Sequence, residues 1–88
     1  MSCTVRIPSP LRSYTAGAAT VAAEGGTVEE VLGSLERRFA GIRFRVVDEQ
    51  SRIRRHMRLY VNTAEVTTLE QPVEAGDIVH LICALSGG

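Results

Sequence analysis

Apolar and polar residues alternate at the start of the chain. Cys3, Val5 and Ile7 are separated by polar residues, which is the period of a β-strand with one buried face. Two prolines follow and end this strand. After a loop at residues 11–17, the small apolar stretch at residues 19–23 predicts a second strand that closes a hairpin with the first.

The next pattern has the period of a helix. Thr27 and Glu30 have the spacing of a capping box, in which each side chain accepts an amide of the first turn, so a helix begins at Thr27. The apolar residues that follow share one helical face: Val28, Val31, Leu32, Leu35 and Phe39. Acidic residues open the helix and two arginines close it, as the helix dipole favours, and Gly41 is expected to stop it.

The second half of the chain predicts strands joined by less regular segments. Residues 42–55 have a mixed pattern and predict an irregular connection that could hold a short strand or turn. Residues 57–61 alternate like the first strand, and Val66 and Leu69 are expected to anchor a short strand or 3₁₀ segment. The most apolar run, residues 78–85, is long for a strand with an exposed edge, so we expect a central strand.

This order of elements predicts the fold class. One helix packed across one mixed sheet is the two-layer solution, and a right-handed crossover through the helix places the last strand beside the first and parallel to it. We therefore expect an α+β protein of the β-grasp, or ubiquitin-like, class, with a mixed sheet of four to five strands packed on one main helix. Residues 1–83 would form this single domain and residues 84–88 a flexible C-terminal tail.

Composition narrows the classes of function. Ten basic and ten acidic residues among 88 give zero formal net charge, so nucleic acid is not an expected partner. No apolar stretch approaches the roughly 20 residues of a membrane span, and no charged start with an apolar core opens the chain, so we expect a cytoplasmic protein. The two cysteines lack metal-ligand spacing, and no metal site is expected.

The end of the chain carries the candidate chemistry. Ser86, Gly87 and Gly88 follow the last strand directly. Glycine has no Cβ, so such a tail can thread a narrow channel with its carboxylate unhindered. Because a carboxylate is a poor electrophile, ATP-dependent adenylation at Gly88 is the expected first step. Attack by a sulfur nucleophile would then give a thiocarboxylate.

Three segments together resemble a known family. They are residues 58–62 (RLYVN), residues 73–81 (VEAGDIVHL) and the terminal Gly87-Gly88. This pattern resembles the ThiS/MoaD family of ubiquitin-like sulfur carrier proteins. The opening residues 5–8 (VRIP) and residues 26–28 (GTV) at the helix start are most similar to the CysO-type carriers within that family.

The resemblance implies a protein co-substrate rather than an enzyme. It implies an E1-like adenylating enzyme that uses ATP to activate Gly88, a sulfur donor, and a sulfur-accepting synthase in the biosynthesis of cysteine or another sulfur-containing metabolite. For CysO-type carriers it further implies a pyridoxal-phosphate-dependent synthase and a metalloprotease that frees the cysteine adduct. The carrier itself would bind no cofactor.

Three other functions are compatible with the same residues. The chain could be a ubiquitin-like modifier joined to lysines of target proteins through Gly88. It could donate sulfur for molybdopterin or thiamin, which uses the same tail. It could also be a plain interaction module whose terminal glycines are incidental.

Strand alternation also predicts a docking surface. If Leu59 faces the helix, then Arg58 and Tyr60 face away from it, and His80 and Ile82 are candidates for the same face. Exposed apolar residues rimmed by arginine suit docking onto an enzyme with acidic groups around its site. The arginine-rich residues 52–58 are likewise expected to form a solvated or partner-facing surface.

Overall fold

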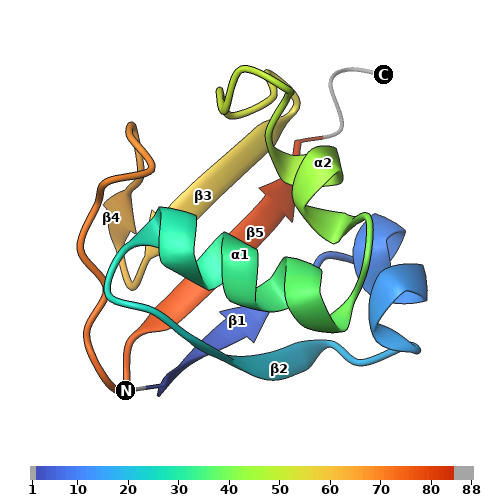
Figure 1. Ribbon diagram of the computed structural model, residues 1–88, viewed down its shortest axis with the longest axis horizontal. Coiled ribbons are helices and arrows are strands. Elements are labelled where there is room, and N and C mark those ends of the chain that lie inside the picture. The colour runs from blue at the N-terminus through green and yellow to red at the C-terminus, as the bar shows by residue number, and fades with distance from the viewer. Residues whose placement is uncertain (1, 85–88) are drawn as a thin grey trace.

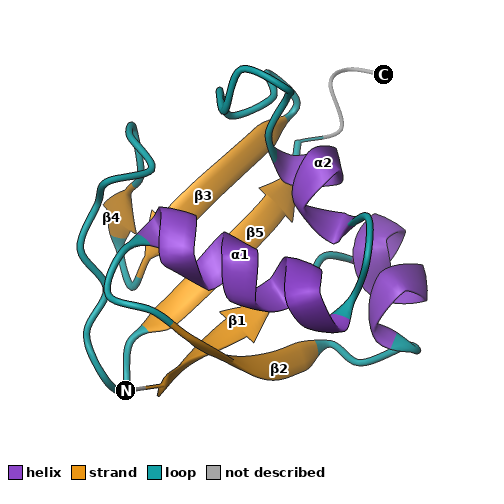
Figure 2. Cartoon of the chain, in the orientation of Figure 1, coloured by secondary structure: helices purple, strands orange, loops and turns teal. Residues whose placement is uncertain are grey.

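The structure, a computed structural model that describes residues 2–84, has one sheet of five strands with helices on one face (Figure 1). The strands are β1 (Ser2–Arg6), β2 (Thr20–Glu24), β3 (Met57–Val61), β4 (Ala64–Glu65) and β5 (Ile78–Cys83). The helices are α1 (Val28–Arg38), the short α2 (Ile42–Val46) and the 3₁₀ helix η1 (Ser9–Thr15). Figure 2 shows α1 lying across the strands.

The strand order confirms the predicted β-grasp fold. The sheet runs β2-β1-β5-β3-β4, so the last strand is central, as its apolar sequence predicts. β5 is parallel to β1 and antiparallel to β3, whereas β1 and β2 form an antiparallel hairpin. The crossover from β1 to its parallel neighbour passes through α1, as a parallel pair requires.

The core lies between the sheet and α1. Alternate residues of the strands point toward the helix, and Val5, Leu59 and Val79 are buried there. The predicted helical face meets them, with four residues of α1 fully buried: Val28, Val31, Leu32 and Leu35. Phe39 follows the last residue of α1 and packs against this core while remaining half-buried.

The predicted capping box is present at the start of α1. Thr27 Oγ1 accepts a hydrogen bond from the Glu30 amide at 3.2 Å. The Glu30 carboxylate accepts in turn from the Gly26 amide at 2.7 Å, one residue before the cap rather than at the cap itself. The Thr27 side chain therefore satisfies one amide of the first turn, and the backbone carbonyls of Gln71 and Leu69 accept from the amides of Val28 and Glu29.

The structure corrects the expectation for residues 42–46, which form α2 rather than a strand or an irregular segment. Gly41 precedes α2 with φ of 98°, and the Glu36 carboxylate accepts the amides of Gly41 and Arg43 at 2.8 and 2.9 Å. These two backbone hydrogen bonds lower the pKa of Glu36. Glu36 therefore caps α2 from the preceding helix, which the local pattern does not reveal.

Two shorter segments also differ from the sequence prediction. Residues 9–15 form η1 instead of a loop. The short fourth strand is Ala64–Glu65, just before the residues expected to anchor it. Val66 is buried and Leu69 packs against the core, so both are anchors without being in the strand.

Two glycine substitutions should change stability in opposite directions. Gly25 has φ of 144°, and an added Cβ would lie 2.8 Å from the Val31 amide nitrogen, so Gly25→Ala should cost about 1–3 kcal/mol. Gly33 lies inside α1, where an added Cβ meets only the Arg37 guanidinium at 3.9 Å, so Gly33→Ala should stabilise by roughly 0.5–1 kcal/mol. Urea unfolding of both variants beside the parent measures the two changes. If both variants lose stability, or both gain it, this account of the two positions is wrong.

Candidate functional site

The face of the sheet turned away from α1 brings the four predicted docking residues together. The antiparallel register pairs Arg58 with Ile82 and Tyr60 with His80. Side chains of directly paired residues share a face of the sheet, and the residues between them on each strand, Leu59 and Leu81, are buried in the core. Whether this face docks onto a partner stays a prediction.

This outward face has an apolar component. Ile82 is 43% exposed and Ile78 is 37% exposed, at opposite ends of β5. Arg58 is exposed beside Ile82, whereas Tyr60 and His80 are half-buried. Apolar side chains with a neighbouring arginine are typical of protein interfaces.

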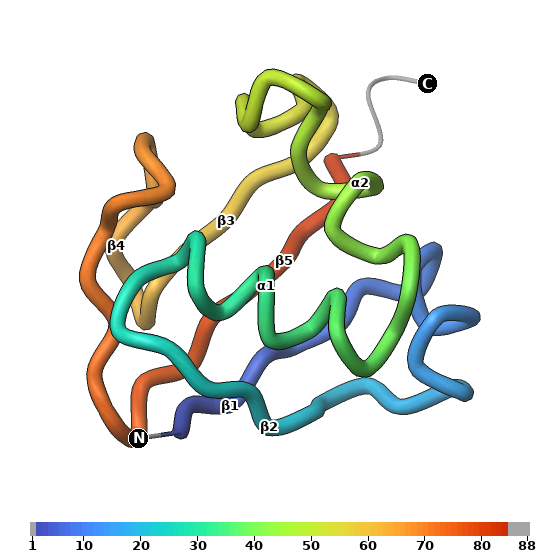
Figure 3. The backbone as a smooth tube through the Cα atoms, viewed as in Figure 1, coloured from blue at the N-terminus to red at the C-terminus, as the bar shows by residue number. Residues whose placement is uncertain are grey.

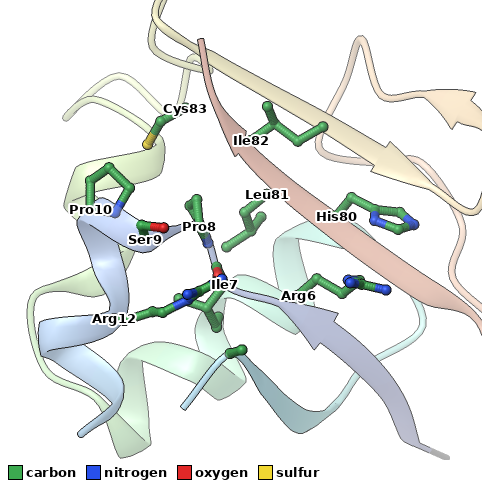
Figure 4. Close-up of a pocket in the computed structure, with 11 residues that line it drawn as sticks. Arg6, Ile7, Pro8, Ser9, Pro10, Arg12, His80, Leu81, Ile82 and Cys83 are labelled. Carbon is green, nitrogen blue, oxygen red and sulfur yellow. The ribbon is translucent and has the colours of Figure 1, made fainter. Parts of the chain in front are cut away.

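A groove of about 480 Å³ lies beside the end of β5 (Figure 4). One wall is formed by Pro8 and Pro10 and the other by residues 80–83. Arg6 and Arg12 also line it, and Arg12 Nε donates a hydrogen bond to the Ile7 carbonyl at 3.0 Å, which fixes its side chain at the groove. His80 and Ile82 thus border a concave site as well as the flat face of the sheet.

The wall formed by the two prolines was missed by sequence reasoning. In the sequence, Pro8 and Pro10 indicate only where a strand ends. Their place opposite β5 depends on the parallel pairing of Arg6 with His80, two residues separated by most of the chain. The prolines alone gave no sign of that neighbour.

The groove also exposes part of a thiol. Cys83 is half-buried at its edge, with Sγ 3.4 Å from Met57 Sδ, and both cysteines are free. Burial raises the pKa of the Cys83 thiol, and the positive charge of Arg45 opposes this shift. Burial and the charge of Asp77 raise the pKa of Cys3. Both thiols are therefore protonated at neutral pH and are poor nucleophiles.

The predicted carrier residues follow directly after the described fold. The Ala84 amide donates to the His56 carbonyl at 2.7 Å, which holds the chain where β5 ends. Ser86, Gly87 and Gly88 lie outside the described residues. Within residues 2–84, no three side chains of His, Cys, Asp or Glu gather as metal ligands. In the same part of the chain, no helix has the length and apolar character needed to cross a membrane.

Comparison with known proteins places the chain in a family. The model of the ThiS family matches residues 5–88. The chain is 36% identical over 93 aligned residues to the sulfur carrier protein CysO of Mycobacterium tuberculosis (strain ATCC 25618 / H37Rv), covering all of both chains. It is also similar to a chain in the crystal structure of the Amycolatopsis orientalis BexX/CysO complex, with a TM-score of 0.91, 39% identity and coverage of 98% of this chain and 99% of that one.

A more distant likeness concerns the fold. The crystal structure of SAMP1 from Haloferax volcanii has a TM-score of 0.83 at 24% identity, with full coverage of both chains. The topology and these likenesses define a ubiquitin-like β-grasp protein. The chain belongs to the ThiS family and is a CysO-like sulfur carrier, a class of protein that is not itself catalytic.

The two thiols should differ in reactivity. Cys83 is half-buried at the groove whereas Cys3 is buried, so iodoacetamide should modify Cys83 well before Cys3 in the folded protein. Because the pKa of the Cys83 thiol is raised, its thiolate fraction, and hence the rate, should keep rising up to and beyond pH 8.5. Peptide mass spectrometry after timed alkylation measures both rates. Faster modification of Cys3, or a rate for Cys83 that is flat above pH 7, would contradict the structure.

Proposed function

We propose that this protein carries sulfur as a thiocarboxylate on Gly88. The observation that carries the proposal is the match of the ThiS family through residue 88, where the sequence reads Gly87-Gly88. The full-length likeness to the sulfur carrier protein CysO supports it.

The chemistry proceeds in two steps on the partner enzyme. The Gly88 carboxylate attacks the α-phosphorus of ATP and pyrophosphate leaves, which gives a mixed anhydride with AMP. Hydrosulfide then replaces AMP at the carbonyl carbon, or a persulfide does so and a second thiol reduces the resulting acyl disulfide, which leaves the thiocarboxylate and a disulfide. The carrier supplies the reacting carboxylate and the surface that the enzyme recognises, and an E1-like adenylating enzyme supplies the catalysis.

The sulfur then passes to a second partner. We propose a sulfur-accepting synthase of cysteine or another sulfur-containing metabolite, with a pyridoxal-phosphate-dependent enzyme as the first candidate and a metalloprotease that releases the product from Gly88. A CysO protein from Amycolatopsis orientalis has been crystallised in complex with BexX, which supports the view that carriers of this type bind other proteins directly. The likeness to SAMP1 lies below 25% identity and supports the fold alone.

The first experiment is the intact mass of the protein in its own host. The protein purified from that host should contain a fraction heavier by the difference between sulfur and oxygen, and fragmentation should locate the added mass at Gly88. Incubation with host lysate, ATP and sulfide should increase this fraction, and omission of ATP should abolish the increase.

A variant that lacks Gly88 provides the control, because its terminal carboxylate is displaced by one residue and it should gain no sulfur. An unmodified parent that also fails to react in lysate would contradict the carrier function. Adducts between Gly88 and lysines of other proteins, without any thiocarboxylate, would favour a protein modifier instead.

The sheet face gives a second prediction. The double variant Tyr60→Ala and Ile82→Ala should lower the initial rate of thiocarboxylate formation by at least about thirtyfold at carrier concentrations below saturation, since anchors at the centre of an interface commonly contribute more than 1 kcal/mol each. Equal rates for the double variant and the parent would remove the docking role from this face.

A further inference from the structure

A second surface lies near Ala84, the last residue that the structure describes. It consists of Phe44, Arg45, Arg54 and Arg55, and we refer to it as the tail-base surface. Phe44 is the most exposed large apolar side chain among residues 2–84, at 52% exposure. It lies on α2, in the helix layer, and so is separate from the outward face of the sheet (Figure 1).

The aromatic ring of Phe44 is held in place although it is exposed. The Arg54 guanidinium lies over the ring at 4.5 Å from its centroid, and Arg54 Nε donates to the Phe44 carbonyl at 2.7 Å. The Arg54 amide also donates to the Val46 carbonyl at 3.0 Å, which ties the same residue to the end of α2. An anchor that is already ordered loses little conformational entropy when a partner covers it.

The arginines of this surface are not neutralised by nearby carboxylates. Arg43 pairs with Glu29 at 2.9 Å, and Arg52 pairs with Asp48 at 3.4 Å. Within residues 2–84, the three arginines of the tail-base surface form no such pair. The surface therefore has a local excess of positive charge although the whole protein has none.

One hydrogen bond and one electrostatic interaction place this surface near the end of β5. The Ala84 amide donates to the carbonyl of His56, which follows Arg55 directly. Arg45 lies close enough to Cys83 for its charge to lower the pKa of that thiol against the effect of burial. Figure 3 shows α2, the start of β3 and the end of β5 at the same end of the molecule.

The length of the remaining chain limits where a partner can sit. Four residues follow Ala84, and at most 3.3–3.6 Å per residue they span about 14 Å when fully extended. An enzyme that encloses Gly88 in a channel must therefore bring the rim of that channel close to Ala84. The rim then meets whatever surrounds Ala84 on the carrier.

We propose that the tail-base surface docks onto an acidic rim around the enzyme channel that receives Gly88. Phe44 packs against apolar side chains at that rim, and Arg45 and Arg55 pair with its carboxylates. Aromatic residues and arginine are the side chains most enriched at the energetic centres of interfaces. This inference rests on the proposed carrier function and adds to it the position and charge of the enzyme surface.

The test measures thiocarboxylate formation at Gly88 by host lysate with ATP and sulfide, over a range of carrier concentrations. Arg45→Glu should raise the carrier concentration for half-maximal rate at least tenfold, and Phe44→Ala about tenfold, with the maximal rate unchanged. Added salt should raise the carrier concentration for half-maximal rate more for the parent than for Arg45→Glu, because the attraction that the variant has lost is electrostatic.

Arg37→Glu is the matched control. Arg37 is also exposed, and Arg37→Glu changes the charge by the same amount as Arg45→Glu. Arg37 and Ser2 line the same surface hollow, at the opposite end of the sheet from Cys83. If Arg45→Glu and Arg37→Glu have the same half-maximal concentration, the docking inference is overturned while the carrier function stands. If the parent itself gains no sulfur, both fail. Arg45 is exposed, and among residues 2–84 no side-chain hydrogen bond or ion pair of Arg45 is present, so Arg45→Glu should unfold at the same temperature as the parent and its loss of rate would be one of docking.

Discussion

The parallel pairing of β1 with β5 is the interaction on which the rest of the structure depends. Thr4, Val5 and Arg6 align with residues 78–80, so the last strand enters the sheet between the first hairpin and β3. The backbone groups of β5 find partners on both edges, which a buried apolar strand needs because unpaired amides and carbonyls are costly away from water. The same pairing forces the crossover through α1, and α1 covers one face of the sheet.

The central position of β5 also determines which surfaces lie near the end of the described chain. The strand ends at Cys83, and the Ala84 amide donates a hydrogen bond to the His56 carbonyl, so the described chain ends beside the start of β3. On one side of this point lie the outward sheet face and the groove bordered by Pro8 and Pro10. The tail-base surface lies on the helix side. Two distinct surfaces near Ala84 suit the proposed function, in which one carrier meets successive enzymes.

In the short helix α2 the structure differs from what the local sequence pattern predicts. Ile42, Phe44 and Val46 alternate as they would in a strand, and a strand would place all three side chains on one face. In the helix, Ile42 and Val46 are one turn apart and buried, while Phe44 is turned toward solvent. The choice is made by Glu36, whose carboxylate caps α2 from the end of α1. A short apolar run is ambiguous until such a contact decides it.

The sequence by itself determined four of the five strands, the cap at Thr27, the central place of the last strand, and the terminal glycines that mark the family, because each can be recognised from residues close together in the chain. It also indicated that Arg58 and Ile82 could share a face, since strand alternation is a local property. Only the tertiary structure decided the groove opposite Pro8, the exposure of Phe44 and its contact with Arg54. These features join segments that are distant in sequence, and periodicity reports which face a residue occupies but not which segment packs against it.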